Sequence, residues 1–212
     1  MKFEVKDGCF RYEKGREILR NISFVFEEAG ILSVLGANGA GKTTLMKCML
    51  GLLPWTSGGP IWMGRTSGIV RQKKFWRRVG LCAPSEISFL CLYGRGTGGH
   101  GAQCALGAVC PAGGEGLGEV DESLETVGIA HLKNKLCNQI SGGEYQLALI
   151  ARALVTEPSL LILDEPESNL DFKNQMIVLE VLKRLCGEKK LSAIINTHFL
   201  NMQWKFPAGP CY

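Results

Sequence analysis

The feature that most constrains this chain is a glycine-rich turn between a predicted buried strand and a predicted helix. The apolar run at 31–35 (ILSVL) precedes Gly36-Ala-Asn-Gly-Ala-Gly-Lys-Thr43, and the run TTLMKCMLGLL then shows helical spacing. Glycines let backbone N–H groups close around a phosphate without clashes from Cβ atoms, and the helix start adds the positive end of its dipole. The spacing of glycine, lysine and threonine in this turn therefore predicts a phosphate-binding loop.

The phosphate-binding loop also assigns roles to single residues. Lys42 is expected to reach the β- and γ-phosphates, and the hydroxyl of Thr43 is expected to bind Mg²⁺. The other loop residues expected to contact the nucleotide are Gly36, Asn38, Gly39, Ala40, Gly41 and Thr44. The loop thus predicts ATP and Mg²⁺ as cofactors.

A second apolar run, at 160–163 (LLIL), ends in two carboxylates. Asp164 at the strand end suits a Mg²⁺-linked role opposite Thr43. Glu165 follows it and can take a proton from an attacking water as a general base. By itself this pair could be an ordinary solvated strand end, but the phosphate-binding loop favours the catalytic interpretation.

The order of the predicted elements indicates an α/β fold. Alternating apolar residues within 1–30 predict a small antiparallel sheet. Buried strands at 31–35, 160–163 and 192–196 alternate with helices at about 143–156 and 173–187. Such alternation predicts a mostly parallel sheet covered on both faces.

Composition and length exclude several classes of function. No apolar run reaches about 18 residues, and the N-terminal MKFEVKDG lacks the apolar core of a signal peptide, so we expect a cytoplasmic chain without membrane insertion. A net charge of +4 gives no reason to expect nucleic acid as a partner. The nine cysteines contain no C-x-x-C pair, so no metal site is expected from them.

The run Ile140-Ser-Gly-Gly-Glu-Tyr-Gln146 opens a predicted helix and resembles the signature sequence of ABC-type ATPases, usually L-S-G-G-Q. The resemblance implies a P-loop NTPase of the ABC type, with an N-terminal antiparallel β subdomain and a helical subdomain. It also implies a nucleotide-bound homodimer, in which Ser141, Gly142 and Gly143 of one copy contact the γ-phosphate held by the other. Ser141 is equally expected to cap its helix, because capping and phosphate binding use the same groups.

Three further matches follow from the resemblance. Ser168-Asn-Leu-Asp171 is similar to the family's dimer-contact loop, and Glu167 stands where threonine is commoner. His198 is similar to the switch histidine that touches the γ-phosphate. Tyr12 stands where the family places an aromatic ring against adenine, although Phe10 and Tyr12 could equally belong to the core.

Residues 1–80 and 119–199 carry the resemblance within a single predicted domain, and the segment 81–118 departs from it. The family's glutamine after the strand near residue 80 is missing, and ten of the 25 residues from 94 to 118 are glycine. Because residues 85–118 contain few large apolar side chains, we expect them to be disordered. The helical subdomain is therefore expected to be disrupted in this chain.

A shifted reading frame offers one explanation of these departures. Codons for residues 81–85, moved one base forward, permit Y-V-P-Q, and those for 93–107 permit T-V-E-E-L-V-V-M-G-R-S-A-H-L-G. In the other shifted frame, residues 199–212 permit P-E-H-A-M-E-I-S-S-R-A-L-L, so 200–212 form a second anomalous segment. We hypothesise that single-base changes scrambled both segments, which the sequence of the gene would test.

The resemblance implies an ATPase that energises an importer through separate integral membrane permease subunits, at the inner face of the membrane. The run D-E-P-E-S-N-L-D-F and the shifted M-G-R-S-A-H-L-G resemble ATPases of iron–siderophore, haem or cobalamin importers. One alternative is a product of a frameshifted gene that binds nucleotide but is defective in hydrolysis or coupling. Another is a soluble ABC ATPase without a transport role, for which paired nucleotide domains or an inserted arm would be expected and are not found in the 212 residues.

Overall fold

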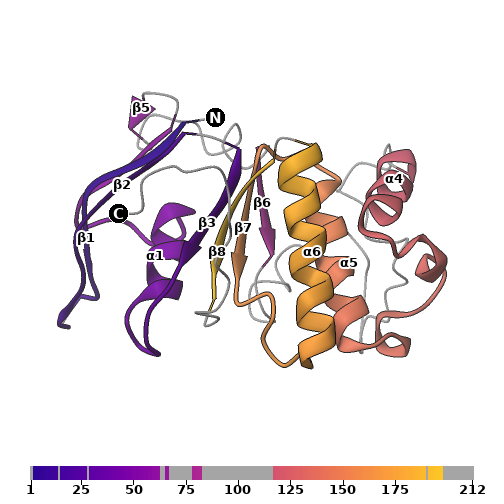
Figure 1. Cartoon of the computed structure of the whole chain (residues 1–212). Coiled ribbons are helices and arrows are strands. Elements are labelled where there is room, and N and C mark those ends of the chain that lie inside the picture. The colour runs from indigo at the N-terminus through magenta and orange to yellow at the C-terminus, as the bar shows by residue number, and fades with distance from the viewer. Residues whose placement is uncertain are drawn as a thin grey trace, which may run out of the picture.

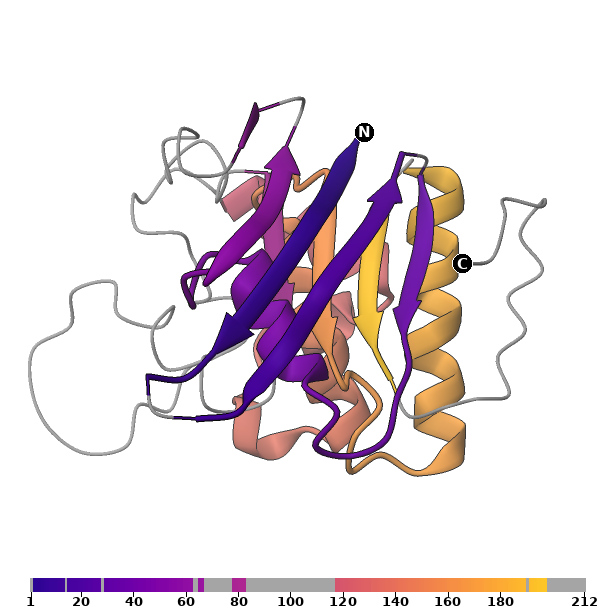
Figure 2. The same cartoon turned by 90° about the vertical axis from the view of Figure 1, so that its left-hand side faces the viewer.

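Two four-stranded sheets lie on opposite sides of helix α1 (Lys42–Met49) in the computed structural model of this chain (Figure 1). The residues that the structure describes are 2–13, 15–27, 29–62, 65–66, 78–82, 117–189 and 191–197. Figure 2 shows the first sheet in front, with the second sheet and the long helices behind it.

The first sheet is antiparallel and has the strand order β2-β1-β4-β5. Its strands are β1 (Phe3–Arg11), β2 (Glu17–Phe26), β4 (Ser57–Trp62) and β5 (Arg65–Thr66). Phe3 and Val5 of β1 point to the core, because alternate residues of a strand face the same side. Register shifts after Val5 change this alternation, so that Gly8 and Phe10 are the next buried residues. The antiparallel sheet predicted within residues 1–30 is therefore confirmed.

The second sheet is parallel and has the strand order β3-β8-β7-β6. Its strands are β3 (Gly30–Val34), β6 (Val79–Cys82), β7 (Leu160–Asp164) and β8 (Ser192–Asn196). The register pairs Val34 with Asn196 and Asn196 with Asp164, so the carboxyl ends of these three strands lie at one level. In Figure 1, β7 and β8 run toward the lower edge, where the loop before α1 also lies.

Two apolar clusters cover the two faces of the parallel sheet. One joins the antiparallel sheet and α1 to the side chains of Leu160, Ile162 and Ile194. The other joins Leu161, Leu163 and Ala193 to helices α4 (Leu117–Val127), α5 (Gly142–Leu154) and α6 (Phe172–Glu188). Adjacent residues of β7 thus face different clusters, which explains why this strand is apolar without alternation.

The predicted α/β fold class is confirmed, with small shifts of element bounds. The helix predicted at 143–156 runs from 142 to 154, and the strand predicted at 31–35 runs from 30 to 34. Within the segment 81–118, residues 81–82 end strand β6, in register with Ile162 and Leu163. Residues 117–118 likewise begin α4, so the expected disorder is wrong at those two positions; residues 83–116 and 198–212 lie outside the described part of the chain.

Cys9, Cys48, Cys82 and Cys186 are free cysteines. Within the part of the chain that the structure describes, no group of three or more His, Cys, Asp or Glu side chains is arranged to hold a metal ion. The helices of the described residues are also too short or too polar to cross a membrane.

Candidate nucleotide site

The loop that joins β3 to α1 depends on glycines at two positions. Gly39 has a φ of 78° and Gly41 a φ of 95°, both in the left-handed region that favours glycine. A Cβ atom on Gly41 would also lie 2.8 Å from Cγ2 of Ile18 on β2. Substitution at Gly41 would therefore strain the backbone and crowd the side chain of Ile18.

Lys42 folds back across this loop. Its side chain is 8% exposed, and its Nζ donates hydrogen bonds to the carbonyl oxygens of Gly36 at 2.8 Å and Ala37 at 3.1 Å. Helix α1 has no acidic residue in its first turn and no side-chain cap at Gly41. The start of α1 thus combines the buried ammonium of Lys42 with backbone N–H groups and the positive end of the helix dipole. Together these groups favour the binding of an anion.

The side chain of Asp164 lies beside the phosphate-binding loop. Its Oδ1 is 3.4 Å from the hydroxyl oxygen of Thr43, which donates to it, and the same Oδ1 accepts a hydrogen bond from Nδ2 of Asn196. The two oxygens of Thr43 and Asp164 are hard donors of the kind that Mg²⁺ binds. The predicted metal pair is thus brought together by the structure.

Glu165 follows Asp164 in a left-handed conformation, with a φ of 49°. Its backbone N–H donates to the carbonyl oxygen of Asn196 at 2.9 Å, and its own carbonyl accepts from the N–H of Ser168 at 2.9 Å. Left-handed backbone at a residue other than glycine is uncommon and is found at functional sites.

Two buried polar residues near the carboxylates, Asn196 and Glu167, received no functional role from the sequence. Asn196 is completely buried at the end of β8, and the only signal for it was a polar residue closing an apolar run. Glu167 is 3% exposed, and its carboxylate accepts a hydrogen bond from the hydroxyl of Thr197. The predicted switch residue His198 lies outside the described residues.

Ser141, Gly142 and Gly143 form the start of α5. The hydroxyl of Ser141 accepts from the N–H of Glu144 at 3.3 Å, while Oε2 of Glu144 accepts from the N–H of Ser141 at 2.7 Å and from its hydroxyl at 2.8 Å. These bonds from the backbone and then the hydroxyl of Ser141 lower the pKa of Glu144. The expected helix cap is confirmed. Among the described residues, no hydrogen bond or ion pair joins this helix start to the loop at 36–43.

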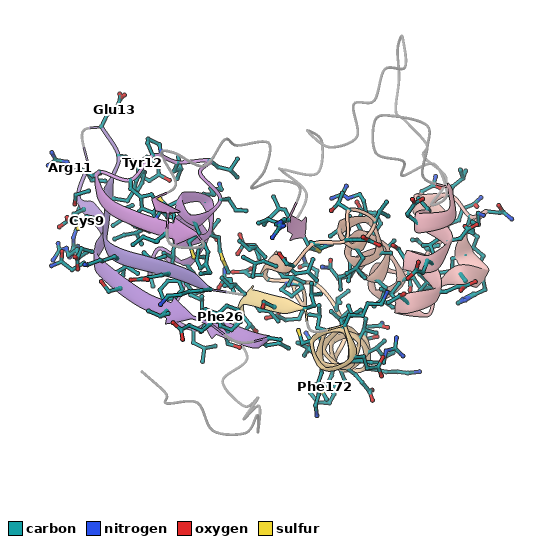
Figure 3. All side chains as sticks on the ribbon, turned by 90° about the horizontal axis from the view of Figure 1, so that it is seen from above. Cys9, Arg11, Tyr12, Glu13, Phe26 and Phe172 are labelled. Atoms are coloured by element: carbon teal, nitrogen blue, oxygen red, sulfur yellow. The ribbon has the colours of Figure 1, made fainter. Side chains whose placement is uncertain are left out.

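Phe10 and Tyr12 occupy different environments. The sequence left open whether both belong to the core or whether Tyr12 is a surface ring that could contact adenine. Phe10 is 4% exposed and belongs to the core, whereas Tyr12 is 49% exposed. Their rings pack edge to face with centroids 4.9 Å apart. Figure 3 shows Tyr12 beside Arg11 and Glu13 at the turn between β1 and β2. Tyr12 is therefore a surface ring supported by a core ring, as a stacking residue requires.

Comparisons with known proteins agree with this arrangement. A family model described as ABC transporter matches residues 19–168, and a second, described as an AAA domain (putative AbiEii toxin, Type IV TA system), matches residues 137–200. An uncharacterized ABC transporter ATP-binding protein of Haemophilus influenzae is 35% identical over 198 residues, which cover 93% of this chain and 74% of that protein.

A probable iron chelatin transport ATP-binding protein of Helicobacter pylori is 32% identical over 211 residues, covering 95% of this chain and 79% of its own length. Among solved structures, cbiO1 of Clostridium perfringens, part of the ABC transporter complex cbiONQ, superimposes with a TM-score of 0.79. It is 25% identical, and the match covers 93% of this chain and 78% of cbiO1.

Proposed function

This chain belongs to the ATP-binding proteins of ABC transporters, and we propose that it binds ATP with Mg²⁺ at loop 36–43 and uses hydrolysis to drive transport through separate membrane permease subunits. It is an ATPase of that family. The single observation that carries the site assignment is the 3.4 Å approach of the Thr43 hydroxyl to Asp164, beside the buried ammonium of Lys42.

The nucleotide is held by the loop and the first turn of α1. Backbone N–H groups from Gly39 to Thr43 donate to phosphate oxygens, and Lys42 exchanges its bonds to the carbonyls of Gly36 and Ala37 for bonds to the β- and γ-phosphates. Tyr12 stacks against the adenine ring. The remaining contacts of the proposed site are made by Asn38, Ala40 and Thr44.

Thr43 and Asp164 would hold the Mg²⁺ ion, since both present oxygen atoms at one point of the sheet edge. When bound, the ion neutralises negative charge on the phosphate oxygens. Glu165 accepts a proton from the water that attacks the γ-phosphorus, the bond between that phosphorus and the oxygen it shares with the β-phosphate breaks, and ADP and phosphate leave. His198 is proposed to contact the γ-phosphate.

A second copy of the chain completes the site. Ser141, Gly142 and Gly143 of one copy present the start of α5 to the γ-phosphate bound by the other copy. Two ATP molecules would then close a homodimer, and hydrolysis would open it. The proposed location is the cytoplasmic side of the membrane, at the permease, with an iron complex of the siderophore or haem type, or cobalamin, as cargo.

The iron assignment is supported by the Helicobacter pylori relative, whose name assigns it to iron chelatin transport. The missing glutamine favours a second candidate, a chain that binds ATP without turnover or coupling. Strand β6 ends at Cys82, and residues 83–85 (Ala-Pro-Ser) contain no glutamine. The third possibility, an ABC ATPase without a transport role, has no supporting observation in the described residues.

The test is to measure binding of a fluorescent ATP analogue and release of phosphate by the purified chain and its variants. Lys42→Ala should weaken binding roughly 10- to 100-fold, because it removes charged hydrogen bonds to the phosphates. Lys47→Ala, in the last turn of the same helix, is the matched control and should bind normally. Binding with turnover supports the proposal, binding without turnover favours the second candidate, and absence of binding contradicts both.

A further inference from the structure

Asn196 is the polar end of an otherwise apolar part of strand β8. The three residues before it, Ala193, Ile194 and Ile195, are all buried in the two apolar clusters. Asn196 is itself 0% exposed. Nothing about its burial therefore distinguishes it from its neighbours, and its amide group needs a separate explanation.

Asn196 is hydrogen-bonded to both residues of the carboxylate pair, to Asp164 through its side chain and to Glu165 through its backbone. Its Nδ2 donates to Oδ1 of Asp164, the same oxygen atom that accepts from the hydroxyl of Thr43. Its backbone carbonyl accepts the N–H of Glu165 at 2.9 Å. One residue thus contacts the side chain of Asp164 and the backbone of Glu165.

The other side-chain atom of this amide has no such contact. Oδ1 of Asn196 is buried and has no hydrogen-bond partner among the described residues. A buried acceptor without a partner destabilises a fold, and a leucine of nearly the same shape would remove that penalty. The feature that an amide adds at this position, and that a leucine would lack, is the hydrogen bond from Nδ2 to Asp164.

We propose that Asn196 is a positioning residue that orients the Asp164 carboxylate for the nucleotide-bound metal ion. This inference rests on the proposed function of the site. The hydrogen bond to Oδ1 restricts rotation of the carboxylate and keeps the side chain of Asp164 directed at Thr43. Groups that hold a metal ligand in this way affect metal affinity although they do not touch the metal.

The test compares Asn196→Leu with the wild-type chain in two titrations of a fluorescent ATP analogue. Without Mg²⁺, both proteins should bind the analogue equally, because Lys42 and the loop N–H groups are intact. In the presence of the analogue, the Mg²⁺ concentration needed for half-maximal enhancement of binding should rise about 10- to 100-fold in Asn196→Leu. Thermal unfolding measured on the same preparations shows whether the variant is folded.

Ser192→Ala is the matched control, since Ser192 is a buried polar residue at the opposite end of the same strand. It should leave the Mg²⁺ dependence unchanged. If Asn196→Leu does not fold, Asn196→Ala is used in the same titrations, with the same expected shift. A folded Asn196 variant with wild-type Mg²⁺ dependence would overturn the inference alone, whereas a wild-type chain that binds no nucleotide would overturn the proposed function and the inference with it.

Discussion

The hydroxyl oxygen of Thr43 lies 3.4 Å from Oδ1 of Asp164, although 121 positions of sequence separate the two residues. Strand β8 lies between β3 and β7, and its register brings Val34, Asn196 and Asp164 to one level. The loop after β3 and the carboxylates at the end of β7 therefore meet at the same edge of the sheet. This is where parallel α/β sheets place their ligands.

Replacing Thr43 by valine, which has nearly the same shape, should lower the affinity of the nucleotide site for Mg²⁺. The change removes a hydroxyl that we assign to the metal, so the Mg²⁺ concentration for half-maximal binding should rise at least about tenfold. Titration of a fluorescent ATP analogue with Mg²⁺ measures this directly. Thr156→Val removes a hydroxyl just after the C-terminal end of α5 and should show no change. Equal curves for both variants would exclude Thr43 as a metal ligand.

Glu165→Gln should bind ATP normally and hydrolyse it about 10²- to 10⁴-fold more slowly. The glutamine keeps the size of the side chain but cannot take a proton from the attacking water. Phosphate release and nucleotide binding are measured on the same preparation, so that a loss of hydrolysis is distinguished from a loss of ATP binding. Glu180→Gln, at an exposed position of α6, serves as the control, and undiminished turnover in Glu165→Gln would assign the general base to another residue.

Gly143→Ala should destabilise the fold, because its Cβ atom would lie 2.6 Å from Cγ and Oδ1 of Asn174 on α6. Overpacking of this kind costs about 1–3 kcal/mol. Gly187→Ala is the matched control with the opposite sign: a Cβ there meets open space, and alanine in a helix should stabilise by about 0.5–1 kcal/mol. Chemical denaturation of both variants measures the free energies of unfolding.

Addition of Asn174→Ala to Gly143→Ala removes the two nearest atoms and should recover part of the loss. Recovery would locate the strain between α5 and α6. If Gly143→Ala unfolded with the same free energy as the wild type, the close packing between these helices would be refuted.

The Ser141–Glu144 pair should stabilise the start of α5 in a pH-dependent way. The pKa of Glu144 is lowered from 4.5 by hydrogen bonds from the backbone N–H and then the hydroxyl of Ser141. The stabilisation is therefore complete above pH 4.5 and is lost as the pH falls through the lowered pKa. In ¹³C NMR titrations, Ser141→Ala should raise the pKa of Glu144 part of the way towards 4.5. The rise is only partial because the hydrogen bond from the backbone N–H of residue 141 remains.

The difference in unfolding free energy between wild type and Ser141→Ala should accordingly shrink in acid. A difference that grew as the pH fell would contradict this assignment. An unchanged pKa of Glu144 in Ser141→Ala would show that the hydroxyl does not contribute to it.

Three buried thiols should resist alkylation in the native protein at about pH 8. Burial raises the pKa of Cys48 to about 11 and the pKa values of Cys82 and Cys186 to about 12, so the reactive thiolate is scarce at each. Cys9 is partly exposed and should be modified first among these four. Mass spectrometry after brief iodoacetamide treatment, with and without denaturant, checks the order, and rapid native labelling of Cys82 would contradict the packing of β6 against α5.

Local patterns in the sequence were sufficient for the elements that carry the site. The loop at 36–43 and the carboxylate pair after 160–163 follow from the order of neighbouring residues, since glycine spacing and strand ends are short-range properties. The cap at Ser141 was predicted for the same reason, and the structure confirms it. The strand predicted at 192–196 agrees with β8 residue for residue.

Contacts between distant segments were decided only by the tertiary structure. Hydrophobic periodicity identifies a buried strand but does not say which strand lies beside it. The pairing of Asn196 with Asp164 could therefore not be predicted from the sequence. The sequence could not separate Phe10 from Tyr12 either, because the bulges between β1 and β2 change which side chains face the core. Register and strand order depend on the packing of the whole sheet, and that packing places Thr43, Asp164 and Asn196 together.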